Sequence, residues 1–278
     1  MTDERTLAPF GRRAAAVTWR ARYGAYVVLG CADTGGPRPQ AGQFYMLSAA
    51  ERWGGGEGER PFLPRAFSVL RAPAGSPELE FLVEDVGPGT KRLAELREGD
   101  EVLLTGPFGV GFTPPRETRR PLLVGGGVGI APLAILQDQL FPNAVPLLGF
   151  RDGAHAAGAE LLIGARIATD DGSAGHHGLV SELLEAELAR DSDVEVYACG
   201  PPAMLEAVRR ECERRGVPAQ LALESGMACG FGACFGCVVV TRGGYLRLCL
   251  EGPVLDANQL AEVSAPEKQP TGATPVNR

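Results

Sequence analysis

The sequence has no long apolar run and no concentration of positive charge. No stretch approaches the roughly 18 consecutive apolar residues that mark a membrane-spanning helix. The formal net charge is -7, whereas a nucleic-acid groove needs clustered cations. We therefore expect neither a membrane nor a nucleic acid as partner. Near the start, Trp19, Arg20 and Arg22 interrupt any signal-peptide core, so the expected location is cytoplasmic.

The chain also has few residues suited to acid–base or nucleophilic catalysis. Its three histidines, His155, His176 and His177, lie in polar stretches, and solvated loop histidines are the simpler interpretation. No Ser/His/Asp set accompanies them, and no pyrimidine site is recognisable. No catalytic side chain is therefore predicted, and any redox chemistry should belong to bound cofactors that the protein orients.

Cysteine is distinctive here because of its arrangement. Four of the seven cysteines follow the spacing C-x4-C-x2-C-x11-C near the C-terminus, at Cys229, Cys234, Cys237 and Cys249. In a reducing compartment this grouping indicates metal ligands rather than disulfides. The spacing is that of plant-type ferredoxins, which hold a [2Fe–2S] cluster. Structural zinc sites usually pair C-x2-C knuckles, and a zinc–thiolate knot stays open as the alternative.

The residues around these cysteines agree with a cluster-binding loop. Small residues let a loop wrap a compact inorganic core and direct backbone N–H groups at sulfur. The stretch "VVVTRGGYLRL" predicts a hairpin, with its turn at Gly243–Gly244, that returns Cys249 to the loop. Cys31 and Cys212 are interpreted as structural. The small residues within the loop are Gly230, Gly232, Ala233 and Gly236.

The first third of the chain predicts a closed antiparallel β-barrel. Six β-rich runs are bounded by Gly, Pro or Asp, at 14–19, 25–31, 43–49, 66–72, 79–86 and 100–109. A short amphipathic helix interrupts them within 90–100, with Leu93 and Leu96 on one face and Gly99 as its stop. The glycine-rich insert at 51–60 is assigned no structure.

After Pro121 the pattern changes to alternating strands and helices. Strands are predicted near 121–125, 143–152, 159–166 and 193–201, with helices after the glycine loop at 125–129 and near 179–190 and 203–216. This alternation is typical of a parallel sheet with right-handed crossovers. We expect a barrel domain at 1–117, an α/β domain at 118–220, a cysteine segment at 221–263 and a disordered tail at 264–278.

Two glycine-containing motifs in the α/β part suggest a nucleotide. In "VGGGVGIAP", bare backbone before a helix allows a pyrophosphate to approach, although the spacing is not the G-x-G-x-x-G fingerprint. In "ACGPPAML", Cys199 ends a strand at the sheet edge where ligands bind. Together the motifs favour a nicotinamide nucleotide.

In the barrel, "RAFS" and "VGPGT" offer groups for an anionic cofactor with an aromatic ring. Strand alternation puts Arg65 and Phe67 on one side, and Ala66 and Ser68 on the other. The alternative is an ordinary edge strand and a helix with Thr90 as its N-cap.

The order of these motifs resembles the ferredoxin–NADP reductase superfamily. Over roughly 10–263 the chain is similar to its PyrK family, the electron-transfer subunits of class 1B dihydroorotate dehydrogenase. The motifs that carry the resemblance are "GQF", "RAFS", "GPGT", "GPFGVGF", "VGGGVGIAPL", "DDGSAGHHGLV", "ACGPPAML" and "LESGMACGFGACFGC".

The resemblance implies a fold and three cofactor sites. It implies FAD on the barrel, NAD on the α/β domain and [2Fe–2S] on the four cysteines. FAD would contact Arg65, Ala66, Phe67 and Ser68, pass beside Leu82, Val83 and Glu84, and place its pyrophosphate at Gly89 and Thr90. The nicotinamide nucleotide would face Gly125, Gly126, Gly127, Gly129, Cys199, Gly200 and Pro201.

The resemblance also implies a partner and a reaction. A catalytic dihydroorotate dehydrogenase subunit carrying FMN, in a heterotetramer with two copies of each chain, would supply electrons. These would pass singly through the cluster to FAD and leave as hydride to NAD+, in pyrimidine (UMP) biosynthesis. Preference for NAD over NADP rests on the resemblance, because no ribose reader is recognisable after "GFRD". The partner-contact candidates, for which core packing is the alternative, are Met227, Phe231, Phe235 and Leu250.

Two other functions remain open. One is a reductase subunit of a hydrogenase or a transhydrogenase complex, although such relatives use a differently spaced cysteine segment. The other is a redox sensor that holds a flavin without turnover. Dye reduction by NADH would distinguish a true electron carrier from a sensor.

Overall fold

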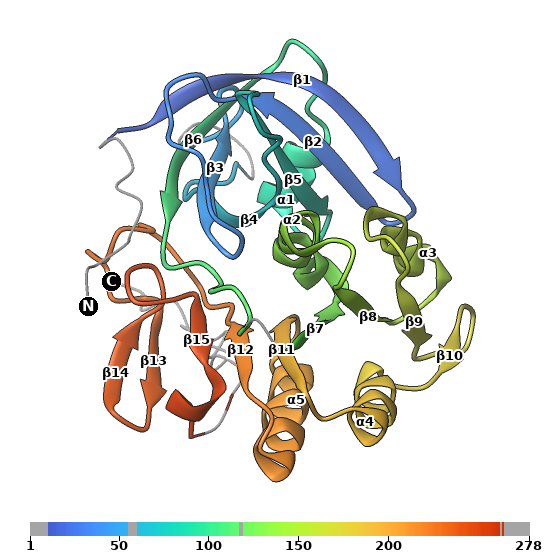
Figure 1. The fold of residues 1–278 in the computed structure, drawn as a ribbon. Helices are drawn as coiled ribbons and strands as arrows, with labels where there is room; N and C mark the ends of the chain where they lie inside the picture. Colours follow the sequence, from blue (N-terminus) through green and yellow to red (C-terminus); the bar gives the residue numbers. More distant parts are fainter. Residues whose placement is uncertain (1–10, 55–59, 117–118, 262, 264–278) are drawn as a thin grey trace, which may run out of the picture.

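Six antiparallel strands close into a barrel in the N-terminal part (Figure 1). The computed structural model describes residues 11–54, 60–116, 119–261 and 263. The predicted tail and the centre of the glycine-rich insert, 55–59, lie outside these residues. Every predicted barrel strand forms. The strands are β1 Arg13–Tyr23, β2 Tyr26–Ala32, β3 Phe44–Ala49, β4 Arg65–Arg71, β5 Glu78–Glu84 and β6 Glu101–Phe108.

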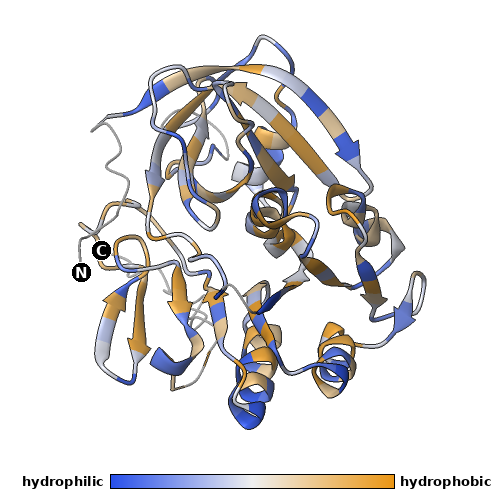
Figure 2. Ribbon diagram, in the orientation of Figure 1, coloured by the Kyte–Doolittle hydropathy of each residue, from blue (hydrophilic) through white to orange (hydrophobic). Residues whose placement is uncertain are grey.

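The barrel order is β1-β2-β5-β4-β3-β6, and β6 pairs back onto β1. Closure leaves no unpaired strand edge. Large apolar side chains such as Tyr45, Phe81 and Leu104 are fully buried. Figure 2 shows hydrophobic residues concentrated in the barrel strands and in helix α2 (Ala131–Leu140), while the C-terminal end of α5 (Pro202–Arg215) is hydrophilic.

The short helix of the barrel, α1 (Pro88–Ala94), differs from its predicted limits. Leu93 and Leu96 are buried, as expected. Thr90 is inside the helix rather than at the N-cap, where Gly87 lies. Its hydroxyl donates to the Gly87 carbonyl at 3.1 Å and accepts from the Val86 N–H at 2.9 Å. The predicted stop at Gly99 is wrong, because the helix has already ended at Ala94.

A seven-stranded sheet forms the second part, in the order β10-β9-β8-β7-β11-β12-β15. Its first six strands are parallel, and β15 runs antiparallel to β12. Helix α2 packs between this sheet and β4 of the barrel (Figure 1). The sheet strands are β7 Arg120–Gly126, β8 Val145–Phe150, β9 Arg166–Thr169, β10 His176–His177, β11 Val194–Cys199, β12 Ala219–Ala222 and β15 Val254–Asp256.

Most connections in this part agree with the expectation. Helices α4 (Val180–Arg190) and α5 form as predicted, and the 3₁₀ turn η1 (Gly127–Ile130) joins β7 to α2. The predicted strand at 159–166 is wrong: η2 (Ala157–Leu161) occupies its first part. The Gln137 side chain bonds both the N–H and the carbonyl of Ile163 at 2.8 Å, so a side chain satisfies this backbone in place of a neighbouring strand.

The cysteine segment contains the predicted hairpin. Strands β13 (Val238–Thr241) and β14 (Gly244–Arg247) pair antiparallel. Thr241 pairs with Gly244, so the two-residue turn is Arg242–Gly243 and lies one residue earlier than predicted. The same segment supplies β15 to the sheet and then η3 (Ala257–Gln259). One further short helix, α3 (Gly153–Ala156), follows β8. No helix of the described chain is long and apolar enough to cross a bilayer.

Candidate functional site

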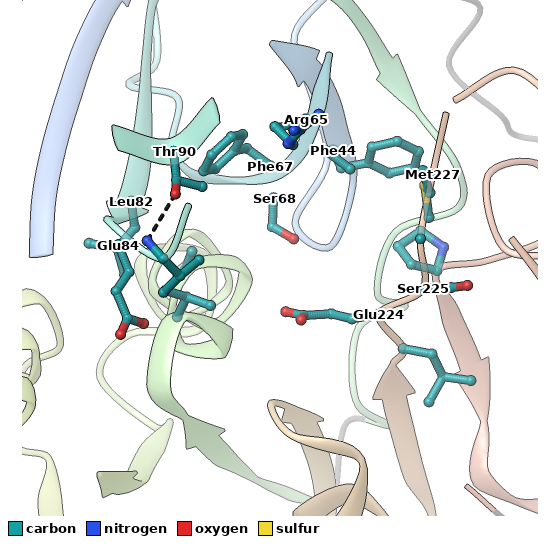
Figure 3. A pocket seen from close by; sticks show the side chains of 17 residues that line it. Phe44, Arg65, Phe67, Ser68, Leu82, Glu84, Thr90, Glu224, Ser225 and Met227 are labelled. Atoms are coloured by element: carbon teal, nitrogen blue, oxygen red, sulfur yellow. Dashed lines mark hydrogen bonds between the residues drawn. The ribbon is translucent and has the colours of Figure 1, made fainter. Parts of the chain in front are cut away.

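A cavity of about 470 Å³ lies where the barrel, the start of α2 and the segment after β12 meet (Figure 3). We call it the barrel cavity. Three separate parts of the sequence form it, so it exists only in the folded chain. Its lining residues are Phe44, Arg65, Ala66, Phe67, Ser68, Leu82, Glu84, Val86, Thr90, Val128, Ala131, Leu223, Glu224, Ser225, Gly226, Met227 and Pro253.

Most of the barrel residues singled out from the sequence line this cavity. All four residues of "RAFS" do so, together with Leu82, Glu84 and Thr90. Val83 does not, because strand alternation turns its side chain into the barrel core, where it is fully buried. Gly89 lies behind Arg65: a Cβ there would come within 2.8 Å of the Arg65 Nε. The absence of a side chain at Gly89 gives the guanidinium its position.

Glu224 is a cavity residue that sequence reasoning missed. Its carboxylate projects into the barrel cavity, on the opposite side from Ser68 (Figure 3). Glu224 is exposed to solvent, but the protein around its carboxyl partly desolvates it and raises its pKa. No hydrogen bond to the carboxyl is seen among the described residues. A charged residue two positions after the buried strand β12 (Ala219–Ala222) was the available signal, but that strand was not predicted.

A second cavity, of about 450 Å³, lies at the carboxyl edge of the parallel sheet. We call it the sheet-edge cavity. Among the predicted nucleotide residues, Gly126, Gly127 and Pro201 line it. The complete lining is Tyr26, Glu84, Gly126, Gly127, Gly149, Phe150, Arg151, His155, Asp170, Leu179, Val180, Ser181, Pro201, Ala203, Met204 and Ala207.

The other predicted nucleotide residues lie behind this surface. A Cβ on Gly129 would be 2.4 Å from the Cys199 carbonyl oxygen, and one on Gly200 would be 2.7 Å from Met204. Gly125 packs against Leu148 in the same way. These positions therefore let the strand ends approach one another, whereas Gly127, at φ +55°, faces open space. The Cys199 thiol is buried, and desolvation raises its pKa well above the ordinary value.

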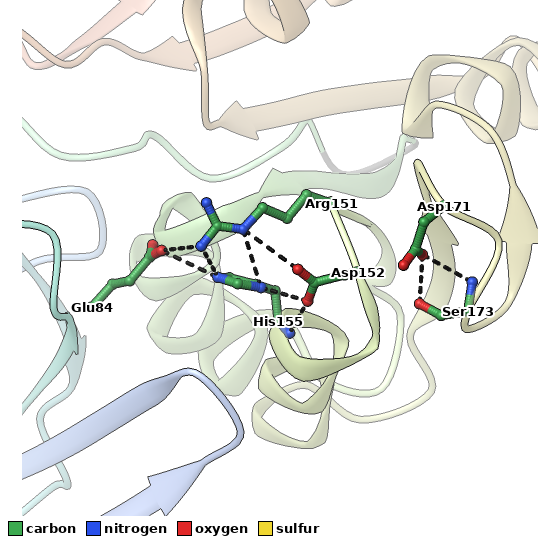
Figure 4. Close-up of polar contacts among 6 residues, drawn as sticks. All are labelled: Glu84, Arg151, Asp152, His155, Asp171 and Ser173. Atoms are coloured by element: carbon green, nitrogen blue, oxygen red, sulfur yellow. Dashed lines mark hydrogen bonds and ion pairs between the residues drawn. The ribbon is translucent and has the colours of Figure 1, made fainter.

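Glu84 belongs to the walls of both cavities. Its Oε1 accepts from Arg151 at 3.0 Å and lies 3.2 Å from the His155 Nε2 (Figure 4). On its other side the His155 ring contacts Asp152 Oδ1 at 2.6 Å. The hydrogen bond with His155 lowers the pKa of the Asp152 carboxyl. This network joins strand β5 of the barrel to the segment that follows β8.

The prediction of a solvated loop is wrong for His155, which is buried in α3. His176 and His177 are exposed, although they form the short strand β10. The His176 Nε2 contacts Glu182 at 2.6 Å. The burial of His155 could not be predicted from its neighbours in the sequence, because its partner Glu84 lies far away in the chain, on a barrel strand.

The four clustered cysteines gather as two pairs of thiols. The Cys237 and Cys249 sulfurs are 3.2 Å apart. Cys229 is hydrogen-bonded to Cys234 and is electrostatically linked to Cys249, so the two pairs are neighbours. Cys234 is exposed, whereas Cys237 and Cys249 are buried. Among the described residues, no three Cys, His, Asp or Glu side chains converge closely enough to hold one metal ion.

Backbone N–H groups around Cys229 point at its sulfur. Burial alone would raise the pKa of this thiol, but hydrogen bonds from the backbone of Cys234, Phe231 and Ala233 and from the Cys234 side chain lower it to about 7. At Cys249, burial and the neighbouring Cys237 thiol raise the pKa to about 12. The loop therefore provides donors that stabilise negative charge on sulfur.

The shape of the loop depends on glycine and on the barrel. Gly230 and Gly232 adopt φ +81° and φ +86°, which side chains rarely adopt. A Cβ on Gly230 would lie 2.5 Å from the Met46 Cγ on β3, so the loop packs closely on the barrel. Cys31 and Cys212 are buried elsewhere, and burial raises the pKa of each to about 12.

Comparison with known proteins identifies the family. A family model described as the iron-sulfur cluster binding domain of dihydroorotate dehydrogenase B matches residues 224–261. The chain is 36% identical to the dihydroorotate dehydrogenase B (NAD(+)) electron transfer subunit of Clostridium acetobutylicum, over 79% of this chain and 85% of the relative. Its identity to the subunit of the same name from Caldanaerobacter subterraneus is 37%, over 81% and 88%. The chain belongs to this family of electron transfer subunits.

Solved structures confirm the predicted fold class. An NADH-dependent reduced ferredoxin-NADP oxidoreductase structure superposes with a TM-score of 0.72 at 23% identity, over 91% of this chain and 92% of that chain. A Neisseria gonorrhoeae ferredoxin NADP+ reductase with bound FAD and NADP gives 0.59 at 20% identity, over 74% and 92%. The family is thus an electron-transfer family of oxidoreductases on a ferredoxin-reductase fold.

The four contact candidates divide into two groups. Phe231 and Phe235 have 47% and 62% of their surface exposed. Met227 and Leu250 are partly buried and pack against a buried apolar cluster that includes Met46, Cys237 and Cys249. Core packing therefore accounts for the latter two, while the two phenylalanines stand at the surface of the cysteine loop beside the exposed Cys234.

Proposed function

We propose that this chain accepts electrons from a catalytic dihydroorotate dehydrogenase subunit and delivers them to NAD+, using a [2Fe–2S] cluster and FAD. The observation that supports this proposal most is that the cysteine loop, the barrel cavity and the sheet-edge cavity adjoin one another. The barrel cavity reaches Met227, two residues before Cys229. Its opposite wall includes Glu84, which also lines the sheet-edge cavity. A path from the cysteines to a nucleotide therefore stays within one short region.

The four cysteines fit an iron–sulfur cluster. Four thiolates hold a [2Fe–2S] centre, and the chain offers two adjacent thiol pairs. The backbone N–H groups at Cys229 favour thiolate over thiol. The proposed ligands are Cys229, Cys234, Cys237 and Cys249.

The barrel cavity fits FAD. Arg65 supplies a cation for a phosphate, held by its hydrogen bond to the Leu63 carbonyl at 2.6 Å, while Phe44 and Phe67 supply apolar walls. The Thr90 hydroxyl is held at the start of α1 by two backbone groups. We assign the flavin to the cavity residues Arg65, Ala66, Phe67, Ser68, Leu82, Glu84 and Thr90. Gly89 and Val83 would support this site indirectly, since Gly89 leaves room for Arg65 and Val83 packs in the barrel core.

The sheet-edge cavity fits a nicotinamide nucleotide. Gly127 leaves the backbone open between β7 and η1, where a pyrophosphate can approach. Gly126 also lines the cavity, and a Cβ there would lie 2.7 Å from the Met204 Sδ. Pro201 forms the facing wall, and Gly125, Gly129, Cys199 and Gly200 let the two walls come together. Bound in these sites, the cluster moves single electrons and the flavin combines them in pairs, which matches the two-electron need of NAD+.

The partner proposal concerns the surface around the cysteine loop. A donor flavin must come close to the cluster, and Cys234, Phe231 and Phe235 are among the exposed residues there. We propose that this face meets a catalytic subunit carrying FMN, in an assembly of two copies of each chain. We also propose domain limits of 1–117, 118–220 and 221–263; the family match at 224–261 supports the third.

Metal analysis and absorption spectra test the proposal. Anaerobically purified protein should contain iron and acid-labile sulfide and show flavin and [2Fe–2S] bands. Mixed with the catalytic subunit, it should reduce NAD+ when dihydroorotate is added. Zinc in place of iron would contradict the electron path. A protein with both cofactors but no dihydroorotate-linked activity would contradict only the partner.

A further inference from the structure

Arg65 brings a positive charge to the wall of the barrel cavity that no carboxylate neutralises (Figure 3). Its guanidinium donates to the neutral Leu63 carbonyl at 2.6 Å, and among the described residues no ion pair to it is seen. By contrast, Arg13, Arg71 and Arg151 each bond a carboxylate at 2.6–3.0 Å. Arg65 therefore keeps its charge for a bound anion, and groups other than carboxylates must hold its side chain.

Two uncharged residues lie against the Arg65 side chain. One is Gly89 on α1, where a Cβ would come within 2.8 Å of the Arg65 Nε. The other is Trp53, whose ring centre lies 6.0 Å from the Arg65 Cζ, at the outer limit of a cation–π interaction. Trp53 is partly buried and packs against the barrel core, and it is not a lining residue of the cavity. Any effect of Trp53 on a ligand there must therefore pass through Arg65.

The backbone around Trp53 is fixed at the base of the glycine-rich insert. The preceding residue, Arg52, has φ +54°, which residues other than glycine rarely adopt. The following residue, Gly54, donates its N–H to the Pro61 carbonyl at 2.8 Å and so joins the two sides of the insert. The indole N–H of Trp53 is buried and has no hydrogen-bond partner among the described residues. The aromatic ring, and not this donor, therefore accounts for the presence of Trp53.

We propose that Trp53 is a positioning residue that holds Arg65 for a phosphate of the flavin dinucleotide without neutralising its charge. The inference deepens the proposed function and rests on the barrel cavity as the FAD site. A carboxylate in the place of the indole would also fix the guanidinium, but it would compete with the phosphate for the same N–H donors. An aromatic ring attracts the cation and leaves those donors free.

Titration of the flavin-free full chain with FAD, followed by flavin fluorescence, tests this role. Trp53→Leu should weaken FAD binding about fivefold, whereas Trp53→Phe keeps a ring and should stay within about twofold. Arg65→Met should weaken binding at least about tenfold, because a charged hydrogen bond is lost. In the Arg65→Met protein, Trp53→Leu should have little further effect. Trp19→Leu is the matched control, since Trp19 bonds Glu78 at 2.5 Å and does not line the cavity.

The outcomes separate this inference from the proposed function. A loss in Trp53→Leu that Trp53→Phe avoids, and that disappears in the Arg65→Met protein, supports the assignment. An unchanged FAD affinity in Trp53→Leu, or an equal loss with and without Arg65, overturns it and leaves the flavin site intact. Trp53→Met is the second variant should circular dichroism show that Trp53→Leu does not fold. If the unaltered protein does not bind FAD, the barrel cavity is not the flavin site, and both proposals fail.

Discussion

A single carboxyl in the barrel cavity should give stability an unusual pH dependence. Desolvation raises the pKa of Glu224, so the unfolded chain releases this proton at a lower pH than the folded chain. Folded stability therefore falls as pH rises from the ordinary glutamate range, about 4.3, towards the raised value. In flavin-free protein, Glu224→Gln should increase the unfolding temperature at neutral pH more than at about pH 4.

Thermal unfolding of both proteins at the two pH values would check this. Glu98→Gln on the exposed barrel surface is the control for removing a glutamate charge. An equal effect of Glu224→Gln at both pH values would mean that the carboxyl is well solvated. The same variant in the complete protein would show whether the group also affects flavin binding.

Glycine positions at the sheet edge differ in what a side chain would meet. At Gly129 a Cβ would lie 2.4 Å from a backbone oxygen of Cys199, which cannot move without shifting β11. Gly129→Ala should therefore lower the free energy of unfolding by about 1–3 kcal/mol. Gly87→Ala is the control, since its Cβ would meet nothing within 4 Å. Urea denaturation measures both, and equal losses would refute the steric explanation.

At the scale of elements, Arg247 connects the hairpin to the cysteine loop. Its guanidinium lies 5.1 Å from the Phe235 ring centre and donates to the Gly232 carbonyl at 3.2 Å. Removal of this side chain should loosen the loop that carries three of the cysteines. Arg247→Ala should therefore shorten the lifetime of the cluster in the presence of an iron chelator severalfold. The visible absorbance of the cluster gives the rate.

Tyr245→Ala is the matched control, because Tyr245 is on the same strand and is 76% exposed. Arg247→Lys separates charge from shape, since lysine keeps the charge but lacks the planar fork. Equal cluster lifetimes in all three variants and the unaltered protein would show that the hairpin holds the loop without this contact.

Strands and helices that depend on the local sequence pattern were predictable, whereas those that depend on contacts with distant parts of the chain were not. All barrel strands follow from apolar and β-branched runs bounded by turn residues. The apolar run around Leu161 has the same local appearance, but Gln137 on α2 satisfies its backbone and no strand forms. Strand β12 is only four residues long and is defined by its pairing with β11 and β15.

At the scale of the whole molecule, the sequence predicted the components of the site but not their shared walls. The cysteine spacing alone indicated the cluster ligands, and the motif order indicated the family. Contacts between the barrel, the sheet and the cysteine segment position Glu84, His155 and Glu224. Contacts between residues so far apart in the sequence depend on the topology of the fold, which local sequence patterns do not encode.

The arrangement of the three sites predicts that one half of the path can work alone. The barrel and sheet-edge cavities share Glu84, and neither is lined by a cluster cysteine. Cys234→Ser changes an exposed thiol, so the fold should survive while the cluster is lost. NADH-dependent dye reduction should then stay within about twofold of the unaltered protein, and dihydroorotate-linked NAD+ reduction by the complex should fall at least about a hundredfold, or 2.7 kcal/mol.

Cys31→Ser is the control for loss of a thiol outside the cluster, since Cys31 is buried in the barrel. It should keep both activities, provided that circular dichroism shows the same fold. Parallel loss of both activities in Cys234→Ser, with flavin still bound, would show that the cysteine segment shapes the nucleotide half. The two halves would then be one inseparable unit, despite the distinct cavities that the fold provides for them.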